Sequence, residues 1–216
     1  MESDKTVRWL KRKNREKGVA IKKIDGLVTV QGDLDLHELE IYRLPEELYV
    51  KGNFNLNGAK NVVLSRKLYV DKGLYLCETD IKELPKYFSF EGGIYLEGTK
   101  IEKLPENFCV NGNLDLERTK IQILPRGLRV LGDLSLECSE IQKLSDNLIV
   151  GGCLKLSNTN VSKLPENLEV GETLYLNRTR INELPDSLRV GRFIVVSEGQ
   201  LKKAPTEELK RKIFMV

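Results

Sequence analysis

The chain has 216 residues, of which 40% are apolar and 31% charged, and its net charge is +3. It is long enough to bury a sizeable core, and its apolar runs are too short to form a transmembrane helix. The charged N-terminus lacks the apolar segment of a secretory signal peptide, so we expect a cytoplasmic protein. Export without a signal, to act in a host cell, stays open.

Charge is unevenly distributed along the chain. Residues 1–24 carry nine Lys or Arg against three Asp or Glu, and residues 202–216 carry five against two. The ends are therefore +6 and +3, which leaves −6 for the residues between them. This division bears on the choice of partner, because a basic end and an acidic body attract different molecules.

The first predicted element is a capping helix within residues 1–23. Ser3 or Asp4 suits its N-cap, Val7 and Leu10 share an apolar face, and Gly18 suits its end. Such a helix would cover the exposed end of a repeat core. The alternative role is nucleic-acid binding through a basic run. Its candidate residues are Arg8, Lys11, Arg12, Lys13 and Arg15.

A pattern of 20 residues repeats across residues 24–205. Most copies carry a Leu-Pro pair, and the spacing of this pair is always a multiple of twenty. The pairs stand at residues 44–45, 84–85, 104–105, 124–125, 164–165 and 184–185. The pair is reduced to Leu-Ser at residues 64–65 and 144–145. The unit reads LxLxxTxIxxLPxxLxVxG, and about nine copies are present.

This unit predicts two short strands in every coil. The segments LxL and LxV alternate, so each presents one face to a core. Proline favours a turn, and glycine permits the bend after LxV. Equivalent residues of successive coils would stack about 4.8 Å apart and fill a continuous core. We expect the threonine hydroxyls to satisfy backbone groups of neighbouring coils.

The segment LxLxxTxIxxLPxxL resembles the leucine-rich repeat, LxLxxNxLxxLPxxL, with threonine in place of asparagine. The fixed length and the Leu-Pro pair are similar to the short bacterial type found in effectors. One departure is that the family's first leucine falls on polar residues such as Gln31, Lys51 and Asp71. The resemblance implies a mainly β, right-handed solenoid of about nine coils, with short capping helices at both ends. It also implies that the LxL strands line the face that binds partners.

The last predicted element is a C-terminal capping helix within residues 206–216. Pro205 and Thr206 suit its beginning, and the next two residues are acidic. Leu209 and Ile213 are four residues apart and would share its apolar side.

No catalytic or metal-binding constellation is expected. The single histidine, His37, shares a repeat column with Cys77 two coils away, at roughly 10 Å, which is too far for a nucleophile and its base. His37 is expected to be an exposed surface residue. The four cysteines fall in different columns, so we predict no disulfide, no metal site and no cofactor.

Candidate binding residues come from the outward positions of the LxL strands. Tyr75 and Tyr95 are expected to stack on neighbouring coils, and tyrosine is a favoured hot-spot residue. Three glutamates would form a ladder of like charge, which a basic partner would neutralise. The full candidate set is Tyr75, Tyr95, Glu97, Asp115, Glu117, Glu137, Lys155 and Tyr175. The plainer alternative is that tyrosine suits a strand and that the glutamates are solvated.

A second candidate surface lies on the outward positions of the LxV strands. Its residues are Tyr49, Tyr69, Arg129 and Arg189.

The sequence thus predicts a non-catalytic, protein-binding solenoid that acts as an inhibitor, adaptor or effector. The expected partner is a protein, and a basic one would suit the glutamates. No membrane partner is expected, and no oligomeric state is predicted. The alternatives are nucleic-acid binding through the basic ends, and a phage anti-defence inhibitor of a host nucleoprotein complex. The second of these rests on analogy alone.

Overall fold

The computed structural model describes residues 2–14, 18–41 and 43–216. It is mainly β, with 27% strand and 6% helix, and forms a β-solenoid of about nine turns with small helices at the ends. The predicted fold class is therefore confirmed. The chain divides into two compact units, Met1–Lys100 and Ile101–Val216.

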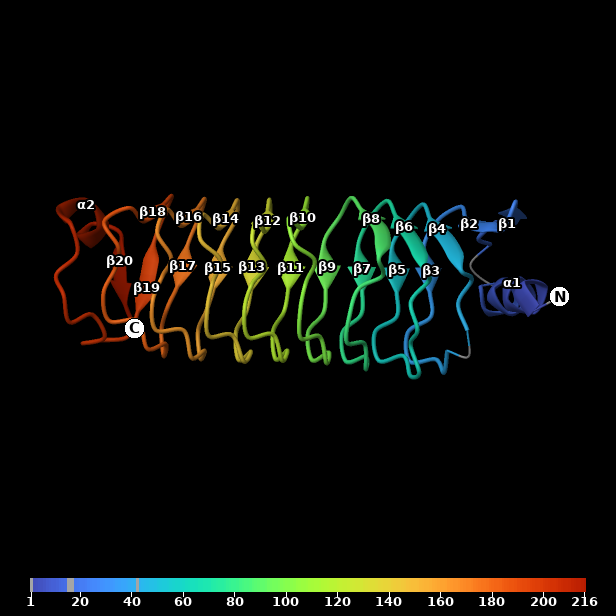
Figure 1. The fold of residues 1–216 in the computed structure, drawn as a ribbon, viewed down its shortest axis with the longest axis horizontal. Helices are drawn as coiled ribbons and strands as arrows, with labels where there is room; N and C mark the ends of the chain where they lie inside the picture. The colour runs from blue at the N-terminus through green and yellow to red at the C-terminus, as the bar shows by residue number, and fades with distance from the viewer. Residues whose placement is uncertain (1, 15–17, 42) are drawn as a thin grey trace. The chain divides into compact units, whose positions relative to one another are not determined.

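The first unit contains helix α1 (Glu2–Lys13) and two sets of strands (Figure 1). The LxV set is β1 (Ile21–Ile24), β2 (Leu27–Val30), β4 (Glu47–Val50), β6 (Lys67–Val70) and β8 (Tyr87–Phe90). The LxL set is β3 (Leu34–Asp35), β5 (Phe54–Asn55), β7 (Leu74–Tyr75) and β9 (Ile94–Tyr95). Successive coils pair in parallel with a shift of twenty residues, as in Leu34 opposite Phe54. The exception is β1, which forms an antiparallel hairpin with β2 that the repeat did not predict.

The second unit has the same two-strand coil (Figure 1). Its LxV set is β10 (Cys109–Val110), β12 (Arg129–Val130), β14 (Ile149–Val150), β16 (Glu169–Val170) and β18 (Arg189–Val190). Its LxL set is β11 (Leu114–Asp115), β13 (Leu134–Ser135), β15 (Leu154–Lys155), β17 (Leu174–Tyr175) and β19 (Ile194–Val196). Strand β20 (Ile213–Met215) adds in parallel to β19, and helix α2 (Glu207–Lys210) precedes it.

The core consists of the inward columns of both strands. Both leucines of LxL are fully buried in nearly every coil, as in Leu114 and Leu116, and the valine of LxV is buried with them, as in Val130. Because equivalent residues stack on one another, each coil covers the apolar surface of the next. Burial of this kind contributes roughly 1.5–3 kcal/mol for each large aliphatic side chain.

The threonine column is buried except at the half-buried Thr179, but its hydrogen bonds differ from the prediction. The hydroxyl of Thr119 donates to the carbonyl of Leu116 at 2.7 Å, within its own coil. The same bond occurs at Thr79, Thr99, Ser139, Thr159 and Thr179. The expectation that these hydroxyls bond neighbouring coils was wrong. They close the turn after LxL locally, because the carbonyl three residues back is the nearest acceptor.

The LxV strands are longer in the first unit than in the second. The difference follows the backbone conformation of the residue immediately before the leucine of LxV. Strands β4, β6 and β8 begin at Glu47, Lys67 and Tyr87, which continue an extended chain. Four of the five equivalent positions in the second unit adopt a left-handed backbone with φ between 54° and 69°. They are Asn107, Gly127, Asn147 and Asn167. Asparagine and glycine tolerate this conformation, so the strands that follow them, β10, β12, β14 and β16, start two residues later. Strand β18 is equally short, although Ser187 at the fifth position does not have a positive φ.

The two helices differ in extent. In α1, Val7 and Leu10 are buried as expected, and the helix packs against β1. In α2, the Thr206 hydroxyl accepts from the Leu209 N–H as an N-cap, and Leu209 is buried. However, α2 ends at Lys210, well short of residue 216. Ile213 belongs to β20 instead, because pairing with β19 satisfies its backbone better than one more helical turn would.

Candidate partner-binding face

Two tyrosines form a stacked pair on the LxL strands of the first unit. Tyr75 in β7 lies opposite Tyr95 in β9 in parallel register, and both side chains are half-buried. Their ring centroids are 4.7 Å apart and their planes differ by 4°. The Tyr75 ring also lies along the backbone of Gly73, where a Cβ atom would approach its Cε2 to 2.8 Å. The lack of a side chain at Gly73 therefore leaves the space that the Tyr75 ring occupies.

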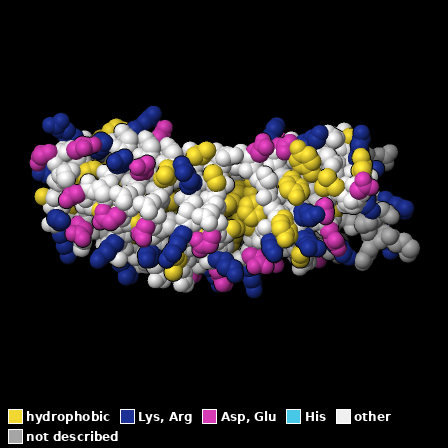
Figure 2. All heavy atoms as spheres, turned by 45° about the horizontal axis from the view of Figure 1, so that its top comes forward, with side chains coloured by type: hydrophobic (Ala, Val, Ile, Leu, Met, Phe, Trp, Pro, Cys, Tyr) yellow, Lys and Arg dark blue, Asp and Glu magenta, His cyan; other side chains and the backbone are white. Residues whose placement is uncertain are grey.

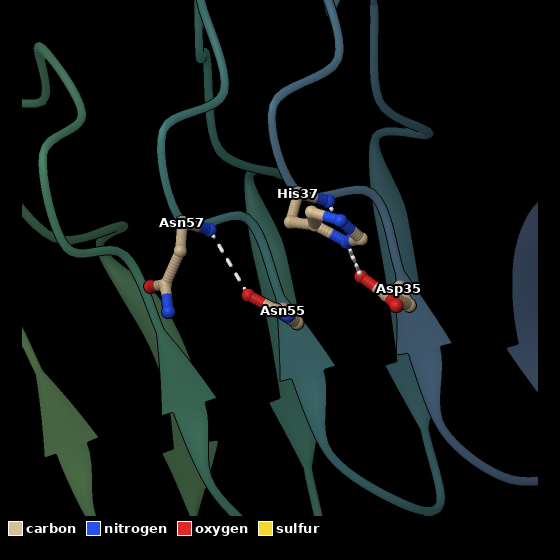
Figure 3. A network of polar contacts seen from close by, with 4 residues as sticks. All are labelled: Asp35, His37, Asn55 and Asn57. Atoms are coloured by element: carbon tan, nitrogen blue, oxygen red, sulfur yellow. Dashed lines mark hydrogen bonds and ion pairs between the residues drawn. The ribbon is translucent and has the colours of Figure 1, made fainter.

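In the two coils that precede the tyrosine pair, short polar turns follow the LxL strands β3 and β5 (Figure 3). The Asn55 Oδ1 atom accepts from the Asn57 N–H at 3.0 Å. Asp35 Oδ1 accepts from the His37 N–H at 3.2 Å and lies 2.6 Å from its Nδ1. His37 is exposed, as predicted. These side chains shape the strand ends and leave the imidazole beside a carboxylate on the surface.

The second unit holds the acidic part of the candidate set. Asp115 Oδ1 accepts from the Glu117 N–H at 3.0 Å, in the same type of turn. The hydroxyl of Ser135, on the next coil, donates to Glu117 Oε1 at 2.5 Å. The Glu117 carboxylate is thus held by the protein's own hydroxyl. This contact reduces the need for a basic partner that the glutamate ladder suggested.

The remaining candidates are placed on the same strands. Lys155 in β15 lies directly opposite Tyr175 in β17, and both are partly exposed. Glu137, on the coil after Glu117, is also partly exposed. The structure therefore groups Tyr75, Tyr95 and Glu97 in the first unit. The other group, in the second unit, is Asp115, Glu117, Glu137, Lys155 and Tyr175.

No protein-family model matches this chain. No curated protein matches its sequence either. The leucine-rich-repeat resemblance therefore rests on the repeat itself.

The second candidate surface is aromatic in the first unit. Tyr49 and Tyr69 pack edge to face, with centroids 6.5 Å apart. The Tyr49 hydroxyl donates to Asp71 Oδ2 at 2.9 Å, and this bond raises the pKa of Tyr49 above its ordinary value of 10.0. Figure 2 shows hydrophobic side chains gathered on the part of this face that carries β4, β6 and β8.

The same surface is charged in the second unit. There, Arg189 forms an exposed ion pair with Glu169 at 3.4 Å, and Arg129 is exposed. Exposed pairs of this kind contribute little to stability.

The sequence reasoning missed a polar ladder that joins the coils. Within the first unit, Asn53 N–H donates to Asp33 Oδ1 at 2.7 Å, and Gly73 N–H donates to Asn53 Oδ1 at 3.0 Å. Within the second, Asn113 and Asp133 repeat this pattern. The sequence indicates this ladder by an Asp or Asn immediately before LxL in four copies of the unit. The recurrence of these residues could be recognised from the sequence, but the backbone N–H that each of them accepts from in the next coil could not.

Several other features bear on chemistry and location. Among the described residues, no three His, Cys, Asp or Glu side chains gather closely enough to hold a metal ion. The four cysteines are free. None of the described helices is both long and apolar enough to cross a membrane.

The basic candidates lie on α1. Arg8, Lys11, Arg12 and Lys13 are exposed, and Arg15 lies outside the described residues.

Proposed function

We propose that the protein is a non-catalytic solenoid of the leucine-rich-repeat type that binds a protein partner on its LxL strands. The support is the repeat LxLxxTxIxxLPxxL, the strands that it forms, and the polar and aromatic side chains that these strands direct outward. The right-handed winding of that family is part of this proposal. The proposed role is that of an inhibitor, adaptor or effector in the cytoplasm.

The observation that carries the proposal is the stacked pair of Tyr75 and Tyr95. Aromatic residues dominate the energetics of protein interfaces, since they bury much area and have few rotatable bonds. This pair is already ordered by mutual stacking and by the backbone of Gly73. A partner would therefore bind it without ordering it first, and this preorganisation lowers the entropic cost of association.

The test is affinity capture from a nuclease-treated lysate of the source organism, followed by titration of the purified partner. The bait variant carries Tyr75→Ala and Tyr95→Ala. The matched control carries Tyr49→Ala and Tyr69→Ala, which also removes two neighbouring tyrosines from the same unit, but from the LxV strands. We expect the first variant to weaken binding about 30-fold or more, as loss of a hot spot does, and the control to bind like the wild type.

Circular dichroism and the melting temperature of each variant verify that it folds. Two results would count against the LxL strands as the binding face. One is equal binding by both variants, and the other is loss of binding in the control alone.

A further inference from the structure

Helix α1 carries a stripe of exposed cations that the protein-binding role does not use. Lys5, Arg8 and Arg12 recur at intervals of three and four residues, so they lie on one side of the helix, with Lys11 beside them. All four are exposed. Within the part of the chain that the structure describes, no carboxylate forms an ion pair with any of them.

The opposite side of α1 faces the protein. Val7 and Leu10 are buried, and Asn14 is buried one turn further on. This burial fixes the orientation of the helix, so the cationic side faces solvent. It also leaves no free apolar stripe for insertion into a bilayer, which a membrane-binding amphipathic helix needs.

The number of cations exceeds what helix stability explains. Cations in the last turn interact favourably with the helix dipole, which accounts for Lys11, Arg12 and Lys13. Lys5 and Arg8 lie before that turn. Moreover, Arg8 and Arg12 are four residues apart, where like charges repel. An external polyanion would relieve this repulsion.

We propose that α1 binds nucleic acid through its phosphate backbone, without reading the base sequence. The stripe from Lys5 to Arg12 is about 10 Å long, since each residue rises about 1.5 Å, and this length matches a few successive phosphates. A cationic surface of this kind gains affinity from counterion release, which favours the densely charged nucleic-acid backbone over an acidic protein. The acidic body, with its net charge of −6 between residues 25 and 201, disfavours contact of a polyanion with the repeat itself.

Trp9 provides a direct probe of this site. It is the chain's single tryptophan, and it is partly exposed. In the sequence of α1 it lies between Arg8 and the pair Lys11 and Arg12. Its fluorescence therefore reports on α1 alone. A base that stacks on the indole would quench it, so single strands are expected to quench more strongly than duplexes.

The experiment titrates the full chain with a short DNA duplex, a single-stranded DNA of the same length, and vesicles rich in phosphatidylserine. The site variant carries Lys5→Gln, Arg8→Gln, Lys11→Gln and Arg12→Gln. The control carries Lys82→Gln, Lys103→Gln, Lys143→Gln and Lys163→Gln, all exposed, and so has the same net charge. Fluorescence of Trp9 and anisotropy of the labelled DNA are read between about 50 and 200 mM KCl.

We expect the wild type and the control to bind DNA in the range of nonspecific affinity, about 10⁻⁴ to 10⁻⁶ M. The site variant should bind at least tenfold more weakly at the lowest salt, and its salt slope should fall by about three to four. The proposal is overturned if neither DNA binds, if both variants weaken equally, or if vesicles bind and DNA does not.

Discussion

Single polar residues close most coils and join several of them to the next. The Thr119 hydroxyl bonds a carbonyl within its own coil, whereas Asp133 Oδ1 accepts the Cys153 N–H of the following coil at 2.7 Å. The first contact shapes a turn, and the second fixes the register between turns. Both satisfy groups that would otherwise lose hydrogen bonds on burial.

Tyr49 gives a prediction at this scale. Its phenol donates to the Asp71 carboxylate, so ionisation would place two negative charges together, and its pKa is raised above 10.0. The stabilisation is therefore complete below pH 10 and is lost as the pH rises through the folded-state pKa. NMR titration of 13Cζ-labelled tyrosine should show a pKa for Tyr49 above 10.0. The Asp71→Asn variant should lower this pKa toward 10.0, and an unchanged Tyr49 titration in the variant would show that Asp71 is not the cause of the shift.

At the scale of the element, the turn at the Leu-Pro pair differs between coils. Most copies have proline at this position, but two have serine, Ser65 and Ser145. Both serines are buried, and neither hydroxyl has a hydrogen-bond partner among the described residues. A buried hydroxyl without a partner is destabilising, and serine leaves the unfolded chain more freedom than proline does.

We therefore expect Ser145→Pro to stabilise the protein by about 1 kcal/mol. The measurement is the midpoint of urea unfolding, which should rise with an unchanged slope. Ser145→Ala serves as the control, because it removes the hydroxyl without adding the ring, and it should give part of the gain. A lower midpoint for Ser145→Pro would mean that the turn here differs from those that contain proline.

At the scale of the molecule, stability is organised along the repeat. The strands of the repeat pair with their counterparts in the preceding and following coils, as β13 pairs with β11 and β15. In the last coil of the second unit, Gln200 Nε2 donates to the Leu176 and Ile181 carbonyls at 3.0 Å. A repeat protein of this kind loses structure locally when one coil is damaged, since stability is a sum over neighbours.

Hydrogen exchange tests this organisation. Leu156 is fully buried, and Leu156→Ala should cost about 2–5 kcal/mol. Protection should fall most in β13, β15 and β17, and least in β4 and β6. Leu56→Ala, at the equivalent position of the first unit, should give the reverse pattern. An equal fall in all strands would indicate that the whole chain unfolds as one cooperative unit.

Much of the fold could be predicted because the repeat places the same residue at the same point of every coil. The inward columns, such as Leu34 and Leu36, are buried as predicted, and Tyr75 and Tyr95 stack as expected. The bonding of Thr119 and Glu117 could not be predicted. Each has several acceptors or donors within reach, and the periodicity does not rank them.

The sequence by itself determined the solenoid, its coil length and the side chains that face outward, because alternation and a fixed repeat dictate which residues can share a core. Only the tertiary structure decided the rest. It placed Ile213 in a strand instead of a helix, because an open strand edge at β19 was available to pair with it. It also gave Glu117 a partner in Ser135, because contacts between coils depend on distances that only the folded chain sets.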